Sequence, residues 1–437
     1  MTEIQLLLKE GLDDFKKLLA KKEISSTPKK YYWRLAFWKK AGDIEPQLNY
    51  FENDSQHLDS RYLSHNWHSF PAKFYPQLIR SLMNICNVKD NYVIYDPYAG
   101  CGTTLVECRL MGFECHGIDI SKLAVLISKV KTNLTINLDK IESKKQQLIK
   151  DYYDFSNLNV DYTNFEKEWY NDFNLKQIKI LQSLILREKN KEIKKLFLVA
   201  LSSILKQVGN TKRGQIEIRF EKKDIKRDVL KIFLNKLNYM VGDIQLFQTK
   251  NHKKSKCTIL NKNASKYHPR GESVDFIITS PPYGNGLDYS KIHKLSLALI
   301  FGEEEIGNLK SGQTGTLSIK SQSIYSTNYT KSGTKIIEDL KSISYSRARS
   351  MSKYYHDMRE SINNMFIALK KKRHCVIIVG GTQINGFEIE NDKVIAEIAN
   401  YVGFKTKKIL KWDYDKLRRS GLVHKIKGES IIILKKE

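Results

Sequence analysis

The 437-residue sequence has no apolar run that approaches the roughly 20 residues of a membrane-spanning helix. Nor does it begin like a secretory signal, because Glu3 stands beside a very short apolar stretch. We therefore expect a cytoplasmic protein. The length is enough to bury a sizeable core and predicts about two or three domains.

Cysteine is scarce, and its six occurrences include no Cys-x-x-C pair. Scattered cysteines in a cytoplasmic protein are expected to be reduced thiols. Cys101, Cys108 and Cys115 are evenly spaced, but a glycine turn and a predicted helix-to-strand transition separate them. We therefore expect no metal site.

Acidic residues are outnumbered, because 48 Asp and Glu face 74 Lys and Arg, for a net charge of +26. A field of that sign attracts polyanions and favours nucleic acid as a partner. The alternative is a generally lysine-rich proteome, in which such a charge carries no function. Charge alone therefore does not name the partner.

The most informative stretch is Val-Asp-Phe-Ile-Ile-Thr-Ser-Pro-Pro-Tyr-Gly at residues 274–284. Phe276, Ile277 and Ile278 in its first half are consecutive apolar residues, which predicts a parallel strand buried on both faces. Pro281 and Pro282 cannot donate ladder hydrogen bonds, so the strand must end there. Ser280 and Tyr283 then stand at the carboxyl end of a strand, where open α/β sheets bind ligands. A hydroxyl, outward carbonyls and a ring suit a flat, polar, stackable group such as a nucleobase.

A second motif, Asp-Pro-Tyr-Ala-Gly-Cys-Gly-Thr-Thr at residues 96–104, follows a predicted strand at 92–95 and precedes a helix pattern. Its two glycines allow close backbone approach, and the helix start offers free N–H groups. A further strand at 113–118 ends at Asp119, a position suited to ribose hydroxyls. This order of strand, turn, helix, strand and acid predicts a Rossmann-like α/β sheet.

The glycine motif differs from the dinucleotide fingerprint, because Leu105 stands where its third glycine belongs. An NAD site would still satisfy much of the pattern. Asp96 precedes the glycines, and an acid there suits an ammonium group better than a pyrophosphate. The motif therefore favours S-adenosylmethionine, a cation with an amino-acid tail.

The rest of the chain divides into regions by pattern. Residues 1–60 have helical spacing and predict an N-terminal helical extension. Its aromatic cluster at 31–38 is either a packing patch or an arm for nucleic acid. Strand–helix alternation is lost from 136 to 255, which predicts a largely helical insertion with a basic second half. The Ser-, Thr-, Gly- and Lys-rich stretch at 303–350 predicts a mobile loop.

Apolar periodicity predicts further elements on both sides of the insertion. They are helices at 77–85, 121–135, 287–301, 351–370 and 391–401, and strands at 257–260, 276–278, 375–379 and 430–434.

Together, the two motifs resemble the paired signatures of the S-adenosylmethionine-dependent amino-group DNA methyltransferases, the N4-cytosine and N6-adenine type. The resemblance covers roughly residues 62–135 and 255–437, and Gly380, Gly381 and the segment from Glu429 also look familiar from its DNA-modifying members. It implies a class I methyltransferase fold, with residues 61–135 and 256–437 as the catalytic domain. We expect the insertion and the loop, which depart from the common core, to recognise DNA.

The resemblance also implies roles for individual residues. The glycine loop and the acids bind the cofactor, and His68 to Pro76 resembles a further cofactor-contacting segment. The Ser-Pro-Pro-Tyr tetrad holds a flipped base. The implied cofactor-binding residues are Lys73, Asp96, Tyr98, Ala99, Gly100, Gly102, Thr103 and Asp119, and the implied catalytic residues are Ser280, Pro281, Pro282 and Tyr283.

These residue types fit the methylation of an exocyclic amine, a poor nucleophile because its lone pair is delocalised into the ring. The Ser280 side chain and the Pro281 carbonyl would accept its two N–H groups and localise that pair. Tyr283 would stack on the base outside the duplex. The amine then attacks the methyl group in line, without a covalent enzyme intermediate.

Serine in the first tetrad position resembles N4-cytosine members, so cytosine N4 is the predicted target and adenine N6 the alternative. No cysteine follows a proline, which disfavours C5 methylation. We expect double-stranded DNA as the partner, in a restriction-modification system with a cognate endonuclease. An RNA or protein-glutamine methyltransferase, or a non-catalytic nucleic-acid-binding protein on the same scaffold, are more distant alternatives.

Overall fold

The computed structural model describes residues 62–437 apart from residues 72, 74–75, 156–160, 249–254, 285–286, 316–322, 385–386 and 414–427. The predicted extension at 1–60 lies outside the described residues. None of the described helices is both long and apolar enough to cross a membrane.

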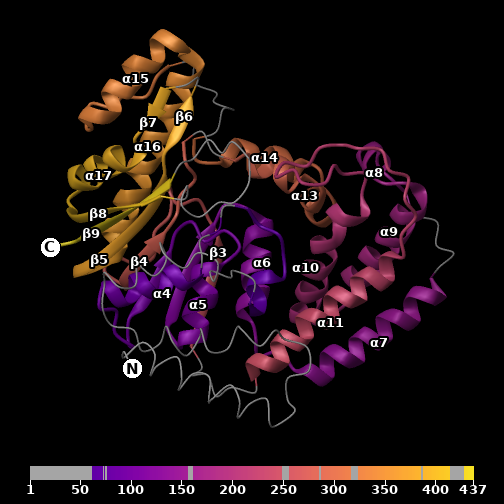
Figure 1. The fold of residues 1–437 in the computed structure, drawn as a ribbon. Helices are drawn as coiled ribbons and strands as arrows, with labels where there is room; N and C mark the ends of the chain where they lie inside the picture. The colour runs from indigo at the N-terminus through magenta and orange to yellow at the C-terminus, as the bar shows by residue number, and fades with distance from the viewer. Residues whose placement is uncertain are drawn as a thin grey trace, which may run out of the picture.

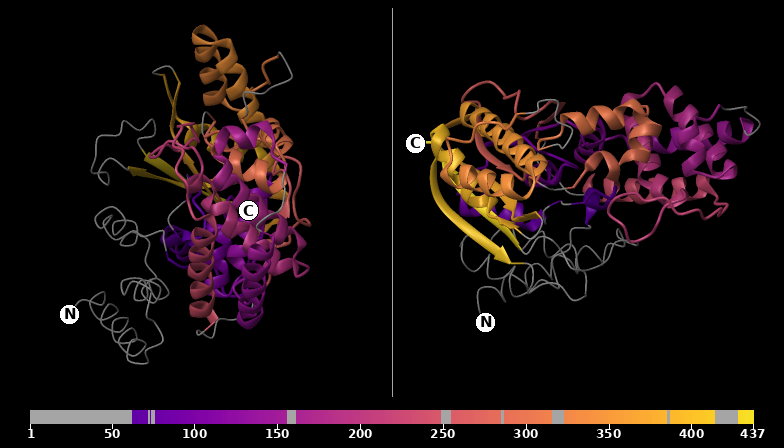
Figure 2. Two further views of the ribbon diagram at one scale, coloured as in Figure 1. Left: turned by 90° about the vertical axis from the view of Figure 1, so that its right-hand side faces the viewer. Right: turned by 90° about the horizontal axis from the view of Figure 1, so that it is seen from above.

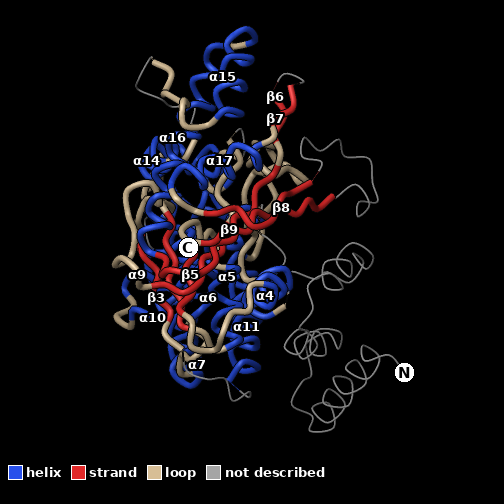
Figure 3. The backbone as a smooth tube through the Cα atoms, turned by 90° about the vertical axis from the view of Figure 1, so that its left-hand side faces the viewer, coloured by secondary structure: helices blue, strands red, loops and turns tan. Residues whose placement is uncertain are grey.

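A seven-stranded sheet with the order β3-β2-β1-β4-β5-β9-β8 forms the centre of the described chain (Figures 1 and 3). Its parallel strands are β1 (Val93–Asp96), β2 (Glu114–Asp119), β3 (Cys257–Asn261), β4 (Val274–Thr279) and β5 (Leu369–Gly380). Antiparallel strands complete one side of the sheet, β9 (Gly428–Lys435) beside β5 and β8 (Lys405–Asp413) beside β9. This mostly parallel sheet confirms the predicted Rossmann-like α/β fold.

β4 is buried along its whole length, as its continuous apolar run predicts. Phe276 and Ile278 belong to the hydrophobic cluster on one face of the sheet, whereas Val274 and Ile277 belong to the cluster on the other. The strand ends at Thr279, directly before Ser280 and the two prolines. The tetrad therefore begins at the carboxyl edge of a central strand.

Helices cover both faces of the sheet. The cluster on the first face includes side chains of α4 (Pro76–Ile85), α5 (Thr103–Met111) and α6 (Lys122–Thr132). The opposite cluster includes side chains of α16 (Tyr345–Ala368) and α17 (Asn391–Val402). These layers leave the carboxyl edge of the strands to the loops that carry both motifs.

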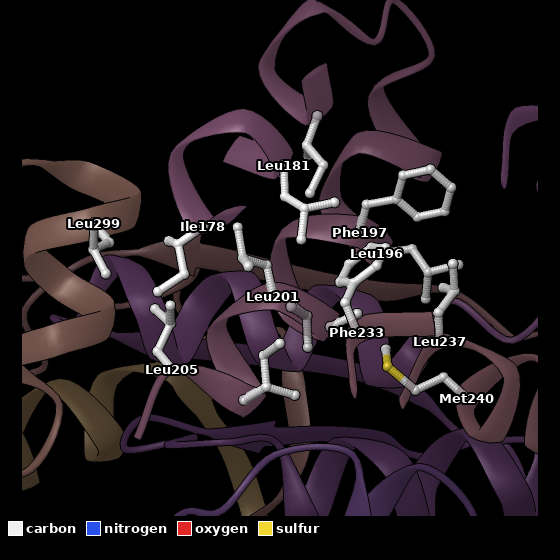
Figure 4. Close-up of a cluster of buried hydrophobic side chains, with 14 of the residues drawn as sticks. Ile178, Leu181, Leu196, Phe197, Leu201, Leu205, Phe233, Leu237, Met240 and Leu299 are labelled. Atoms are coloured by element: carbon white, nitrogen blue, oxygen red, sulfur yellow. The ribbon is translucent and has the colours of Figure 1, made fainter. Parts of the chain in front are cut away.

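Helices make up most of the described part of 136–255, and a long loop at 209–228 lies between the last two of them. Their buried side chains form one hydrophobic cluster that also includes residues of α6 and of the segment 295–299 (Figure 4). Leu196, Phe197 and Leu205 of the predicted helical stripe are buried there. Figures 1 and 2 place this region at the opposite end of the molecule from β8 and β9. Its helices are α7 (Leu138–Asp154), α8 (Asn164–Trp169), α9 (Asp172–Arg187), α10 (Lys191–Val208) and α11 (Val229–Gln248).

The prediction of a mobile loop at 303–350 is wrong for most of its length. The structure has α14 (Glu304–Gly312) and α15 (Lys331–Ile343) there, and α16 begins at Tyr345. Thr330 caps α15 by accepting a hydrogen bond from an amide of its first turn, and Ile336, Ile337 and Leu340 are buried on one side. The polar composition concealed a capped, amphipathic helix, which projects beyond the sheet (Figure 3).

Two other elements differ from the sequence prediction. The helix expected at 287–301 divides at His293 into α12 (Tyr289–Ile292) and α13 (Lys294–Phe301). β8 and the hairpin of β6 (Thr382–Ile384) and β7 (Phe387–Ile389) were not predicted. The division matters for the site, because it places Tyr289 next to the glycine loop.

Candidate functional site

The two sequence motifs meet at the carboxyl edge of the sheet. β1 and β4 are parallel neighbours, and their last residues are Asp96 and Thr279. Thr279 Oγ1 donates a 2.7 Å hydrogen bond to Asp96 Oδ1, although 183 positions separate the two residues. The fold thus joins the motifs directly and places the insertion to one side.

A cavity that opens to solvent lies between the two loops, with about 890 Å³ of empty space when the open solvent at its mouth is included. Four of the predicted site residues do not line it, namely Asp96, Gly102, Pro281 and Tyr283. The predicted residues that line it are Lys73, Tyr98, Ala99, Gly100, Thr103 and Asp119 from the cofactor set, with Ser280 and Pro282 from the tetrad.

Gly100 and Gly102 give the glycine loop its shape, because both have positive φ, +51° and +85°. A Cβ on Gly102 would come within 2.9 Å of Ser128 Oγ and 3.2 Å of Ser128 Cα on α6. Ser128 Oγ in turn donates a 2.7 Å hydrogen bond to the Gly100 carbonyl. A side chain at Gly102 is therefore excluded, and the loop lies directly on α6.

Asp119 is the acid that faces the cavity. Its carboxylate accepts the backbone N–H of Gly100 at 2.9 Å and that of Ser121 at 2.8 Å. Burial raises its pKa to about 6, and in the described part of the chain it forms no ion pair. Each carboxylate oxygen has two lone pairs, so Asp119 can still accept hydrogen bonds from a ligand.

Asp96 has a supporting position below the cavity. It is 1% exposed, and it accepts the Thr279 hydroxyl and the Tyr98 N–H, the latter at 3.1 Å. Burial raises its pKa to about 6 as well. Direct contact between Asp96 and a ligand therefore stays a prediction. The structure shows instead that Asp96 is hydrogen-bonded to Thr279 at the end of β4.

Aromatic residues that the sequence did not single out form another wall. Phe70 and Tyr289 line the cavity and stack with centroids 5.6 Å apart, and Phe70 also stacks on His293 at 4.6 Å. The Phe70 ring lies 3.5 Å from where a Cβ of Gly100 would be. Phe70 falls inside the predicted cofactor segment at 68–76, but Tyr289 carries no sequence signal.

The far wall comes from the segment that was predicted to be a loop. Leu309 and Gly312 of α14, followed by Gln313 and Thr314, line the cavity. Gln313 Oε1 accepts the Tyr289 N–H at 3.2 Å, which ties this segment to α12. Residues of α14 and of the turn that follows it therefore form part of the cavity wall.

The tetrad presents two different faces. Ser280 and Pro282 line the cavity, whereas the Tyr283 hydroxyl points to β9 and donates a 2.7 Å hydrogen bond to Glu429 Oε1. Ser280 Oγ lies 3.4 Å from Tyr283 Oη. Burial and the nearby Glu429 carboxylate raise the Tyr283 pKa well above its ordinary value, so the phenol stays neutral. The Ser280 hydroxyl thus stands between the cavity and a half-buried ring.

A DNA methylase family model, N6_N4_Mtase, matches residues 8–130, a range that contains the glycine motif and ends before the tetrad. The Type II methyltransferase M.MvaI of Kocuria varians is 25% identical over an alignment of 395 positions that covers 82% of this chain and 85% of that protein. The Type II methyltransferase M.AvaI of Nostoc sp. is 23% identical over an alignment of 404 positions that covers 79% of this chain and 80% of that protein. These matches reach across the insertion and both motifs.

Among solved structures, a SAM-dependent methyltransferase from Methanosarcina mazei covers 84% of this chain and 99% of its own, with 9% identity and a TM-score of 0.31. That likeness is too low to bear on the fold, which rests on the strand order described above.

Proposed function

We propose, on the premise that the chain belongs to the amino-group DNA methylase family, that it transfers a methyl group from S-adenosylmethionine to N4 of cytosine in duplex DNA. The observation that carries the proposal is the position of Ser280 and Pro282 in the wall of a cavity built by the glycine loop and Asp119. The acceptors for an amine thus adjoin the place for the methyl donor.

The residues of the cavity fit S-adenosylmethionine. Asp119, an acid without an ion-pair partner among the described residues, suits ribose hydroxyls beside a cationic ligand. The glycine loop allows close backbone approach, although the N–H groups of Gly100 and Gly102 already donate within the protein. Thr103 begins α5, where the helix dipole favours a carboxylate. When bound, S-adenosylmethionine supplies the electrophilic methyl group.

In this proposal the tetrad residues hold and activate the base. Ser280 Oγ and the Pro281 carbonyl accept the amine N–H groups, which localises the nitrogen lone pair toward the cavity. Tyr283 provides a ring on which a base outside the duplex can stack. Serine rather than aspartate at the first position favours cytosine N4, with adenine N6 as the alternative.

We assign the catalytic core to residues 61–135 and 256–437 and DNA recognition to the helical insertion at 136–255. A long loop joins α10 and α11 there, and Phe220 and Ile225 are largely exposed on it. Cationic and apolar side chains together suit phosphates and bases. The exposed cations of this loop are Lys212, Arg213, Arg219, Lys222 and Lys226.

We expect N4-methylcytosine as the product when the protein is incubated with duplex DNA and labelled S-adenosylmethionine. Digestion to nucleosides followed by mass spectrometry identifies the modified base. N6-methyladenine would contradict the cytosine assignment, and the absence of any methylated deoxynucleoside would contradict the DNA proposal. The same strand supplied single-stranded serves as the control for duplex recognition.

We expect the affinity for S-adenosylmethionine to fall by up to about tenfold between pH 7 and pH 5. Asp119 and Asp96 have pKa values of about 6, and the ionised carboxylate is the better partner for hydroxyls and cations. Affinity is therefore nearly complete at pH 7 and falls as the pH drops through 6. His68 and His293, with pKa values lowered by burial to about 4 and about 3, do not titrate in this window.

Calorimetric titration with S-adenosylmethionine at several pH values checks this expectation. The Asp119→Asn variant provides the control, because an amide at that position has no proton to gain. Its affinity should be weaker and should vary less with pH than that of the wild type. An equally steep pH dependence in the variant would rule out Asp119 as a source of the effect.

A further inference from the structure

We propose that Glu429 is a positioning residue for methyl transfer, which fixes the proton of the Tyr283 hydroxyl and thereby leaves Ser280 Oγ free to accept a hydrogen bond from the target amine. The inference rests on the proposed function and deepens it. It adds a residue that lies about 150 positions beyond the tetrad and outside both motifs.

Glu429 is held at the carboxyl edge of the sheet by strands on both sides. It pairs with Gly380, the last residue of β5, and with Trp412 of β8. β5 also pairs with β4, where Ile377 is opposite Thr279. Gly380 therefore lies three residues beyond the end of β4, level with the tetrad. Backbone pairing on both sides gives the Glu429 carboxylate a defined position.

The direction of the hydrogen bonds follows from the chemistry of the groups. An ionised carboxylate only accepts, and a phenol has a single proton. The 2.7 Å hydrogen bond from Tyr283 to Glu429 consumes that proton, so Tyr283 Oη has only lone pairs left for Ser280. Ser280 Oγ, 3.4 Å away, must then be the donor in their contact.

This polarity determines what Ser280 offers to a ligand. With its proton directed at Tyr283, the serine presents lone pairs to the cavity, which its side chain lines. Without the carboxylate, the tyrosine proton could turn to Ser280, and the serine proton would then face the amine N–H. The serine proton and the amine N–H would then repel each other. Because the amine would have lost this acceptor, its lone pair would stay delocalised into the ring.

A purely mechanical role for Glu429 predicts different behaviour. If the carboxylate only fastened the tetrad turn to β9 through the Tyr283 hydroxyl, its loss would loosen the turn whether or not Ser280 kept its own hydroxyl. If it acts by directing the Ser280 proton, its loss has no effect once the Ser280 hydroxyl is absent. A double-mutant cycle separates these two roles.

The experiment measures single-turnover methyl transfer to duplex DNA for wild type, Glu429→Leu, Ser280→Ala and the double variant. Glu429→Leu should lower the rate about 10- to 100-fold, the range for one ordered hydrogen bond in a site. In the Ser280→Ala background, which keeps the contact between Tyr283 and Glu429, the same change should alter the rate by less than about twofold. Glu429→Gln keeps an acceptor oxygen and should recover part of the rate, and S-adenosylmethionine affinity should change by less than about threefold throughout.

Ser430→Ala is the matched control on the same strand, because Ser430 Oγ donates a 2.8 Å hydrogen bond to Asp392 instead. Its rate should stay near that of the wild type. Multiplicative losses in the double variant, or a loss in Ser430→Ala as large as in Glu429→Leu, would overturn the inference alone. A wild-type protein that binds S-adenosylmethionine but methylates no DNA would overturn the proposed function, and the inference with it.

Discussion

Replacement of Tyr283 by alanine is expected to lower the rate of methyl transfer about 100- to 1,000-fold and to leave S-adenosylmethionine affinity within about threefold of the wild type. Stacking of a base on an aromatic ring contributes about 1–3 kcal/mol. Loss of the hydroxyl also removes the ordered contact with Glu429 and Ser280, worth a further 1–3 kcal/mol or so. The cofactor affinity is spared because Tyr283 does not line the cavity.

Tyr283→Phe is the informative partner of that variant, because it keeps the ring and loses only the hydroxyl. The difference in rate between the alanine and phenylalanine variants therefore measures the contribution of the ring. Tyr401→Ala, at a side chain that is 64% exposed on α17, controls for the loss of a surface tyrosine. A loss of cofactor binding in Tyr283→Ala would contradict the position given to this residue.

The central motifs were predictable because their signals are local. The continuous apolar run of β4 and the prolines behind it specify a buried strand that stops, and the glycines after β1 specify a tight turn. Both strands end at the same edge of a parallel sheet, so their loops had to be near each other. The hydrogen bond from Thr279 to Asp96 shows that the ends of the two strands are in direct contact.

The contacts that complete the site were not predictable, because they join residues without a local signature. Tyr289 lines the cavity from α12, a short helix that the sequence prediction had merged with α13. The link between Tyr283 and Glu429 depends on the antiparallel insertion of β9 between β5 and β8. β8 itself was missed because it is an edge strand rich in lysine, which lacks the apolar run of a central strand.

A buried charge cluster behind the glycine loop is a further feature that the sequence did not reveal. Glu107, in the middle of α5, is fully buried and accepts hydrogen bonds from Tyr62 Oη at 2.6 Å and from Arg80 of α4. His65 Nε2 lies 2.7 Å from the same carboxylate. Burial raises the pKa of Glu107, but Arg80 and His65 outweigh it and hold the pKa below the ordinary value. The cluster thus fastens α5 to α4, and Thr103 in the first turn of α5 lines the cavity.

Replacement of Arg80 by methionine is expected to lower the free energy of unfolding by about 3–5 kcal/mol, since it leaves a buried carboxylate without its cation. His65 cannot substitute, because burial lowers its pKa to about 4 and it is neutral at pH 7. Urea unfolding monitored by circular dichroism measures the change. Lys341→Met, which breaks an exposed pair with Glu338 on α15, should cost no more than about 1 kcal/mol.

The double variant Arg80→Met with Glu107→Leu discriminates between the loss of a charge partner and the loss of packing. With both charges removed, no ion is left buried, so the double variant should be more stable than Arg80→Met alone despite carrying one more substitution. Further destabilisation in the double variant would mean that Arg80 acts through its packed stem rather than through Glu107. Because Glu107 and Thr103 share α5, Arg80→Met should also weaken S-adenosylmethionine binding, and the double variant should recover it in step with stability.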